Sequence, residues 1–245
     1  MPDYAGPNVC NVVPALLGRR PVEWLPEAVE GSSTVVLLVL DGLGWEAIGS
    51  HPHELPELNA LGGGPITTVV PSTTPVALTS IATGLPPSRH GITGFRIRLE
   101  GTVLNAIRWQ QADGKRPPDP EVFQRQEVFG GRAVPVVTKQ EFRGSGLTGA
   151  HLRGTEFLGW QTTAILVEHV RAQADAGAPF VYAYYPGIDE VAHAYGLGAP
   201  FYPAELAAAD RLVGAVLDAL PAHAALIVTA AVSYTHLTLP TIYSV

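Results

Sequence analysis

Four side chains in this sequence could hold metal ions and perform nucleophilic chemistry. Asp41 follows the apolar run 35–40, and Thr74 opens a helical pattern. Asp189 and His193 are spaced i, i+4, so on a helix they share one face. Carboxylates and imidazoles are typical zinc ligands and also suit manganese or iron. A hydroxyl becomes a good nucleophile when a metal ion or a base lowers its pKa. This set of residues therefore favours phosphoryl transfer at a metal centre.

Each of these residues also has a structural interpretation when it is considered alone. Asp41 precedes a glycine and suits a turn. Thr74, or Thr73 beside it, suits a helix N-cap, and Asp189 could begin a helix. A single histidine such as His193 is usually structural. The joint arrangement is what indicates chemistry: we expect each group to follow a strand of one parallel sheet, where ligands bind at the carboxyl ends of the strands.

The elements that position these groups can be predicted from apolar patterning. The continuous run 35–40 indicates a strand buried on both faces. The stretch "ITTVVPSTTPVALTSIATG" indicates a strand, a turn and a helix. Within it, Thr74 is the expected N-cap, Pro75 the first helical residue and Gly84 the end of the helix.

Further strands and helices alternate along the rest of the chain. "GRAVPVV", "APFVYAYY" and "AALIVTA" indicate strands, and "TTAILVEHVRAQADAG" indicates a helix. A second helix has an apolar stripe formed by Leu206, Leu212, Val213, Val216, Leu217 and Leu220. This alternation predicts an α/β fold with a doubly wound, mostly parallel sheet and helices on both faces. We expect one domain over residues 1–231, with a polar, proline-broken cap or insertion near 95–130.

Composition limits the classes of partner. The 245 residues are 47% hydrophobic and 15% charged, with a formal net charge of −7, so no basic surplus is available to bind nucleic acid. The single cysteine, Cys10, excludes an internal disulfide. No signal peptide and no apolar stretch of roughly 20 residues is evident, which favours a cytoplasmic protein without a membrane partner. The oligomeric state stays open.

Three motifs together resemble a known family. "LVLDGLG", "VVPSTTPVALTSIATGLPPSRHGI" and "GIDEVAHAYG", in this order, are similar to the alkaline phosphatase superfamily, in its nucleotide pyrophosphatase/type I phosphodiesterase branch. The resemblance covers residues 33–231. It implies two divalent metal ions, zinc or else manganese, with Asp41 and Thr74 on one and Asp189 and His193 on the other. It further implies that Thr74 attacks a phosphodiester or nucleotide pyrophosphate, and that water then hydrolyses the covalent intermediate.

One departure from the family concerns the substrate. Phosphodiesterase members commonly carry a phosphate-binding asparagine shortly after "HGI", and here that position falls near Phe95. Arg96, Arg98 or Asn105 could replace it; Arg96 and Asn105 are the substrate-binding candidates. The departure leaves a phosphomonoesterase or phosphomutase open as an alternative. A non-catalytic protein that binds a phosphorylated ligand is a third interpretation.

A second departure concerns the C-terminal stretch. In the family, the strand that "AALIVTA" resembles is followed by Asp-His-Gly, which supplies two metal ligands, and a later histidine completes the other metal. Here Ala231 is followed by "VSYTHLTLPT", which can be encoded by a DNA-library adapter translated in frame. We therefore expect residues 232–245 to be non-native, and the truncated chain to be inactive or nearly so.

Overall fold

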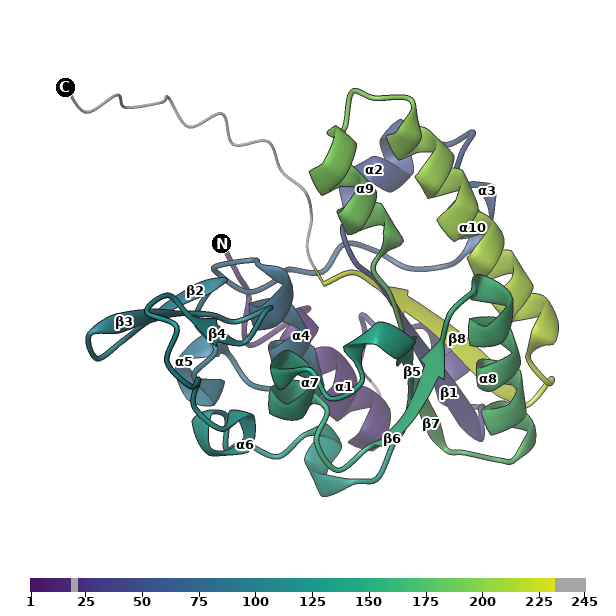
Figure 1. Ribbon diagram of the computed structural model, residues 1–245. Coiled ribbons are helices and arrows are strands. Elements are labelled where there is room, and N and C mark those ends of the chain that lie inside the picture. Colours follow the sequence, from purple (N-terminus) through teal and green to yellow (C-terminus); the bar gives the residue numbers. More distant parts are fainter. Residues whose placement is uncertain (19–21, 232–245) are drawn as a thin grey trace.

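A five-stranded parallel sheet forms the centre of the protein (Figure 1). The computed structural model describes residues 1–18 and 22–231, so the segment 232–245 lies outside the described residues. In spatial order the strands are β6 (Glu156–Trp160), β5 (Pro135–Lys139), β7 (Phe180–Tyr185), β1 (Thr34–Leu40) and β8 (Ala224–Thr229). Every pairing in this sheet is parallel. The predicted α/β fold with a mostly parallel sheet is thus confirmed.

β1 is the strand from which both halves of the core are built. All seven of its residues are buried, and it is hydrogen-bonded to β7 on one side and β8 on the other. Successive side chains of a strand point to opposite faces. Val35, Leu37 and Val39 join one hydrophobic core, and Val36, Leu38 and Leu40 join the other. This explains why the sequence of β1 is apolar throughout instead of alternating.

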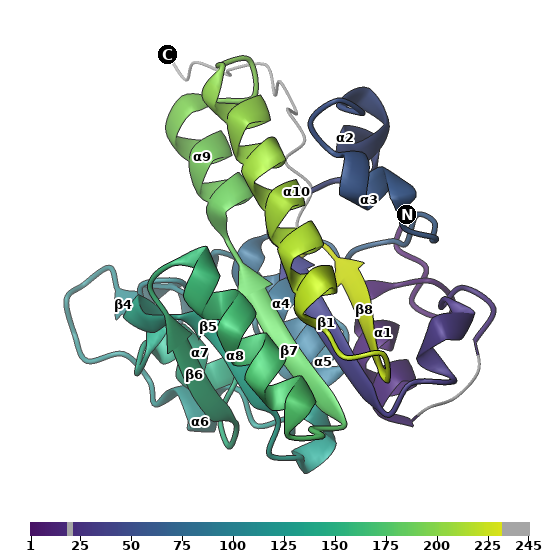
Figure 2. The same cartoon turned by 90° about the vertical axis from the view of Figure 1, so that its right-hand side faces the viewer.

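Helices cover both faces of the sheet (Figure 2). The first core contains residues of α1 (Val9–Gly18), α4 (Thr74–Thr83) and α7 (Gly146–His151). The second contains residues of α3 (Pro56–Ala60), α8 (Thr163–Asp175), α9 (Gly187–Tyr195) and α10 (Phe201–Ala219). The apolar stripe expected on α10 faces this second core: Leu206, Leu212, Val213 and Val216 are buried, and Leu217 and Leu220 pack against it.

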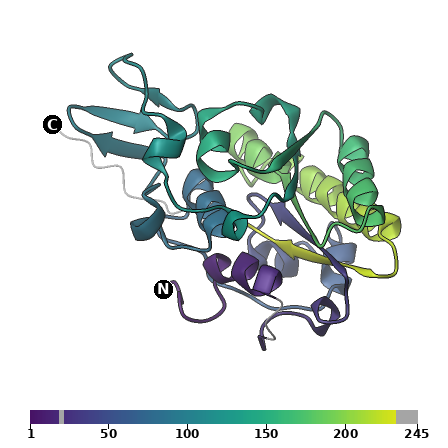
Figure 3. The same ribbon diagram turned by 90° about the horizontal axis from the view of Figure 1, so that it is seen from below.

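The range 95–130 contains a second, antiparallel sheet beside the main one (Figure 3). Its strands are β2 (Arg96–Leu99), β3 (Thr102–Asn105) and β4 (Gln110–Gln111). The remaining short elements are η1 (Glu27–Val29), α2 (Trp45–Ser50), α5 (Pro87–His90), α6 (Pro120–Phe123), η2 (Phe129–Gly131) and η3 (Gln140–Phe142). None of the helices within residues 1–18 and 22–231 is long and apolar enough to cross a membrane.

The strand expected just before Thr74 is not formed. In "ITTVV" only Thr67 makes a β-bridge, and its partner is Asn8 at the start of the chain. The Thr68 hydroxyl donates to the Ala231 carbonyl at 3.2 Å, so the segment is joined to the residues just after β8 through a side chain. Pro65 and Pro71 also bracket the segment and lack the N–H that a strand needs. This segment therefore packs with the N-terminal residues and leads into α4 as a loop.

Candidate active site

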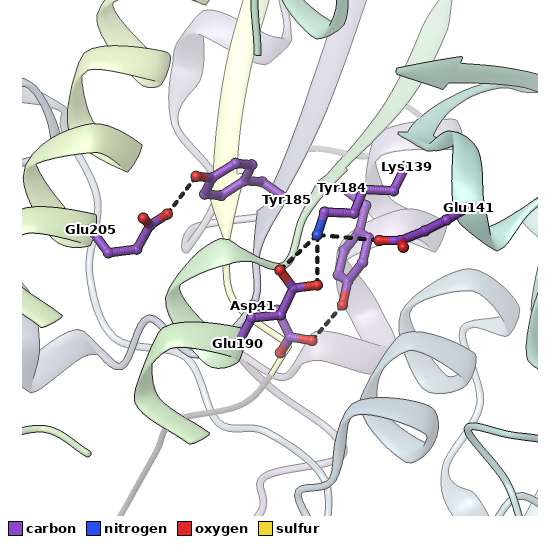
Figure 4. A network of polar contacts seen from close by, with 7 residues as sticks. All are labelled: Asp41, Lys139, Glu141, Tyr184, Tyr185, Glu190 and Glu205. Carbon is purple, nitrogen blue, oxygen red and sulfur yellow. Dashed lines mark hydrogen bonds and ion pairs between the residues drawn. The ribbon is translucent and has the colours of Figure 1, made fainter. Parts of the chain in front are cut away.

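Asp41 is the residue directly after β1, and its side chain is fully buried. Its backbone N–H donates to the Tyr185 carbonyl at 2.9 Å, so β7 holds the Asp41 backbone in place. The Tyr184 phenol donates to Asp41 Oδ2 at 2.6 Å (Figure 4). Among the described residues, Asp41 Oδ1 is buried and has no hydrogen-bond partner. Because an unpartnered buried carboxylate oxygen is costly, this oxygen marks a position where a cation would be stabilised.

The electrostatics of Asp41 support this assignment. Burial raises the pKa of Asp41 to about 7, and the negative charge of Asp189 contributes to the rise. The Tyr184 phenol, which donates to Oδ2, lowers that pKa, and the nearby Thr74 hydroxyl and Gly42 backbone lower it further, but together they do not cancel the effect of burial. Two carboxylates that share a buried site are expected to behave in this way when no cation is bound. A divalent ion beside them would favour the ionised form.

Thr74 lies at the first helical position of α4, with Thr73 as N-cap and Pro75 second. The prediction that Thr74 is the N-cap and Pro75 the first helical residue is therefore wrong by one position. Thr73 has the extended backbone of an N-cap, and its carbonyl accepts the Ala77 N–H at 2.9 Å. The Thr73 hydroxyl makes no capping bond. The Thr74 side chain is not used as a cap either and acts instead on Asp41, whose pKa its hydroxyl lowers.

Asp189 and His193 lie on α9, as predicted. His193 Nε2 is 3.5 Å from Asp189 Oδ1, so the i, i+4 pair does share one face. The Asp189 backbone N–H donates to the Asp41 carbonyl at 3.1 Å. The side chain of Asp189 is 16% exposed and that of His193 66%, which leaves the imidazole open to solvent. Burial raises the pKa of Asp189, and the nearby His193 lowers it.

The residues present fit part of a two-metal site. Asp41 and Thr74 form one oxygen pair, and Asp189 with His193 forms a carboxylate–imidazole pair about the same sheet edge. The unpartnered Asp41 Oδ1 is suited to an ion. Within residues 1–18 and 22–231, no group of three or more His, Cys, Asp or Glu side chains is placed to hold a metal. The described residues thus supply two ligand pairs and not a complete ligand set.

The sequence analysis missed two polar groups that adjoin these residues. Tyr184 is the first of these. The sequence signal that could have indicated it is a tyrosine near the end of β7, the strand that pairs with β1. The other is Lys139, at the end of β5, whose Nζ lies 2.7 and 2.6 Å from the two Glu190 carboxylate oxygens and 3.3 Å from Glu141 (Figure 4). Because Glu190 follows Asp189 directly, this ion pair joins β5 to the ligand-bearing helix.

The two substrate-binding candidates lie in the small antiparallel sheet. Arg96 on β2 is exposed and stands opposite Asn105 on β3. Asn105 Oδ1 accepts the N–H groups of Ile107 and Arg108 at 3.1 and 3.0 Å. The Asn105 carboxamide oxygen is therefore engaged in a local turn. The structure brings Asp41, Thr74, Asp189 and His193 to one place, and it leaves these two residues in the small sheet.

A pocket of about 390 Å³ lies away from these groups, beside α6, α7 and β6. Arg143, Ser145 and Phe157 are among its lining residues, and none of the four predicted catalytic and metal-binding residues lines it. The chemical groups are gathered instead at the carboxyl edge of the parallel sheet, which is where such sheets place their ligands.

Comparisons with known proteins agree with this geometry. The sequence pattern of the family "Type I phosphodiesterase / nucleotide pyrophosphatase" matches residues 35–240. No curated protein matches the chain significantly.

Solved structures with a similar fold include murine ectonucleotide pyrophosphatase/phosphodiesterase 5, as an inactive threonine-to-alanine variant in complex with AMP. It is 14% identical, with a TM-score of 0.56. Another is phosphonoacetate hydrolase from Sinorhizobium meliloti 1021 in complex with phosphonoacetate, 21% identical with a TM-score of 0.54. The matches cover 80% and 82% of this chain, but only 56% of either solved chain. The match to the family pattern, over more than half of the sequence and all three motifs, shows that this chain belongs to the type I phosphodiesterase/nucleotide pyrophosphatase family.

Proposed function

We propose that this chain is the nucleophile-bearing part of a metal-dependent phosphoric ester hydrolase that cleaves phosphodiester or nucleotide pyrophosphate bonds. The observation that carries the proposal is the contact of the Thr74 side chain with a buried Asp41, one of whose oxygens has no partner. Family membership supports the same reaction class. A small nucleotide-type substrate is supported by a relative of similar fold that was solved with AMP.

The residues of the chain divide the chemistry between them. The Thr74 oxygen attacks phosphorus in line with the leaving group; a new O–P bond forms, the bond to the leaving oxygen breaks, and the departing group takes up a proton. Water then cleaves the phospho- or nucleotidyl-threonine and regenerates the Thr74 hydroxyl. Asp41 and Thr74 would hold one divalent ion, and Asp189 and His193 the other. When bound, two zinc or manganese ions would lower the pKa of the hydroxyl and offset the charge on the phosphoryl oxygens.

We further propose that the remaining metal ligands come from residues beyond the described range, and that the 245-residue chain alone is inactive or nearly so. Two ligand pairs bind divalent ions more weakly than complete sets of three or four. The chain spans only 56% of the length of the solved relatives, and the described residues contain no group of three His, Cys, Asp or Glu side chains placed to hold a metal. Both observations support a metal site whose remaining ligands come from residues beyond the described range.

The test uses the protein encoded by the source locus when it is read past codon 230. We expect the β8 strand to continue into Asp-His-Gly, and the product to hydrolyse bis-p-nitrophenyl phosphate until a chelator is added. p-Nitrophenyl phosphate, assayed in parallel, separates diester from monoester preference. An uninterrupted genomic reading through "SYTHLTLPT" would instead show that the C-terminal segment is native.

Thr74→Ala should lower kcat by at least about 1,000-fold, because it removes the nucleophile. Thr73→Ala is the matched control: it deletes a neighbouring hydroxyl that makes no capping bond and should retain most activity. If Thr74→Ala stays active, Thr74 is not the nucleophile. Strong, Thr74-dependent turnover by the 245-residue chain would contradict the proposed incompleteness.

A further inference from the structure

The Asp41 carboxylate is held asymmetrically. Tyr184 donates to Oδ2 at 2.6 Å, whereas Oδ1 has no partner among the described residues. The terminal torsion of an aspartate is broad, so a buried carboxylate can present either oxygen unless a hydrogen bond selects one. Here the short bond from the Tyr184 phenol fixes Oδ2, while the Thr74 hydroxyl and the Gly42 backbone influence the carboxylate without partnering Oδ1 among the described residues.

The phenol is itself held in place. Tyr184 lies on β7, in register with Val39 of β1, so its backbone is fixed by the same parallel ladder that positions Asp41. Its ring is buried and packs at 47° against Phe142, with ring centroids 6.2 Å apart. A tyrosine has only two side-chain torsions, so these contacts leave its hydroxyl little freedom. The orientation of the Asp41 carboxylate is therefore set by the fold before any ligand arrives.

We propose that Tyr184 is a positioning residue that orients Asp41 so that Oδ1 is presented to a divalent metal ion. The inference rests on the proposed function, since it takes Asp41 to be a metal ligand. Ligating carboxylates generally need an outer hydrogen bond, and its loss typically weakens metal binding by about 10- to 100-fold. In this proposal Tyr184 acts through its hydrogen bond to Asp41.

The same strand provides a matched control. Tyr182 points to the same face of β7, is fully buried and packs on Phe129 with ring centroids 5.4 Å apart. Its hydroxyl has no hydrogen-bond partner among the described residues. Tyr182→Phe and Tyr184→Phe therefore remove the same buried atom from the same strand, and only the second removes a hydrogen bond to Asp41.

The experiment measures Mn²⁺ binding by the protein encoded by the source locus read past codon 230, in which the ligand set is expected to be complete, with the free ion followed by electron paramagnetic resonance. We expect Asp41→Asn to abolish the strongest binding, Tyr184→Phe to weaken it by about tenfold, and Tyr182→Phe to leave it unchanged. If Asp41→Asn removes binding but Tyr184→Phe binds like the wild type, the positioning role is wrong and the metal site stands. If Asp41→Asn has no effect, or the wild type binds no Mn²⁺ at millimolar concentration, the proposed metal site is wrong and the role of Tyr184 fails with it.

A second measurement covers the case in which Tyr184→Phe does not fold. Tyr184→Phe should lose stability because the Asp41 carboxylate loses its hydrogen bond. The double variant Asp41→Asn/Tyr184→Phe should therefore recover a cooperative melt close to that of Asp41→Asn. The effects of the two substitutions on the melting midpoint, measured by circular dichroism, would then be non-additive. A double variant that is no more stable than Tyr184→Phe alone would show that Tyr184 acts by packing, and it would overturn the proposal.

Discussion

The backbone N–H of Asp189 donates to the backbone carbonyl of Asp41 at 3.1 Å, which ties the first turn of α9 to the end of β1. The two carboxylates that are proposed to serve different metal ions are therefore positioned by main-chain contact and not only by side-chain packing. Gly42 permits this approach: a Cβ on Gly42 would lie 2.6 Å from the Asp189 nitrogen and 2.8 Å from its Cα. The spacing between the two ligand pairs thus depends on a residue that has no side chain.

Gly42→Ala should destabilise the chain and disturb both ligand pairs. Its φ of +86° costs an alanine roughly 1–2 kcal/mol, and the clash with backbone atoms of Asp189 should add about 1–3 kcal/mol. Gly101→Ala is the control, because φ there is +76° but a Cβ would meet nothing within 4 Å. Urea unfolding of both variants separates the cost of the positive φ, which both share, from the cost of the clash with Asp189, which only Gly42→Ala has. Equal losses in the two variants would show that the contact with Asp189 is unimportant.

Asp41 should make the metal-free chain less stable as the pH rises. Its folded pKa of about 7 lies above the ordinary aspartate pKa of 3.8, so the folded state binds the proton more tightly. The resulting stabilisation is complete below about pH 4 and is lost as the pH rises towards 7. Relative to Asp41→Asn, the wild type should therefore lose up to about 4 kcal/mol between pH 4 and pH 8. A pH-independent difference in unfolding free energy between the two proteins would refute this.

His90 should make the chain sensitive to acid in the same pH range. Burial lowers the pKa of His90 from 6.5 to about 4. Its Nδ1 accepts the Ile92 N–H at 3.1 Å, and its Nε2 lies 2.8 Å from Ser80 Oγ, an arrangement that suits a neutral ring. The unfolded state binds the extra proton, so stability present above pH 6.5 is lost as the pH falls towards 4, by up to about 3 kcal/mol.

The corresponding variant is His90→Gln. It should be less stable than the wild type at pH 7, but it should lose less stability between pH 7 and pH 5. The measurement is the unfolding free energy of the wild type and of His90→Gln at pH 7 and at pH 5. If the wild type and His90→Gln lose the same amount on acidification, the protonation of His90 is not responsible.

Asp210 should stabilise a helix that lies far away in the sequence. This buried carboxylate on α10 accepts the N–H groups of Glu57 and Leu58, at 3.1 and 2.9 Å, at the start of α3. Asp210→Ala leaves both donors without their partner and should cost about 2–4 kcal/mol. Asp218→Ala removes an exposed carboxylate from the same helix and should change stability by less than about 0.5 kcal/mol. Similar melting midpoints for the two variants would contradict this role.

Part of the site was predictable because its signals are local. An apolar run that ends in Asp41 predicts a buried strand with a carboxylate at its carboxyl end. The spacing of Asp189 and His193 predicts a shared helical face, and the helix formed. The cap assignment at Thr74 was wrong by one residue, because either Thr73 or Thr74 can serve as an N-cap and the sequence does not distinguish them.

Other features depended on contacts between distant segments. "ITTVV" has the composition of a strand, but its Thr67 pairs with Asn8 near the start of the chain and its Thr68 hydroxyl donates to the Ala231 carbonyl. Asn105 has the chemistry to bind a phosphate oxygen, but its side-chain oxygen accepts two N–H groups of a local turn. Propensity and residue type could not reveal either outcome.

The sequence by itself determined the family and the class of fold. Its motifs place a threonine, two aspartates and a histidine in a parallel α/β framework, since residue type and periodicity are local properties. The tertiary structure decided which oxygen of Asp41 is free, that Tyr184 holds the other, and that Asp189 is joined to Asp41 through the main chain. These relationships arise when β1 and β7 pair, because residues more than 140 positions apart come within hydrogen-bonding distance only after the sheet has formed.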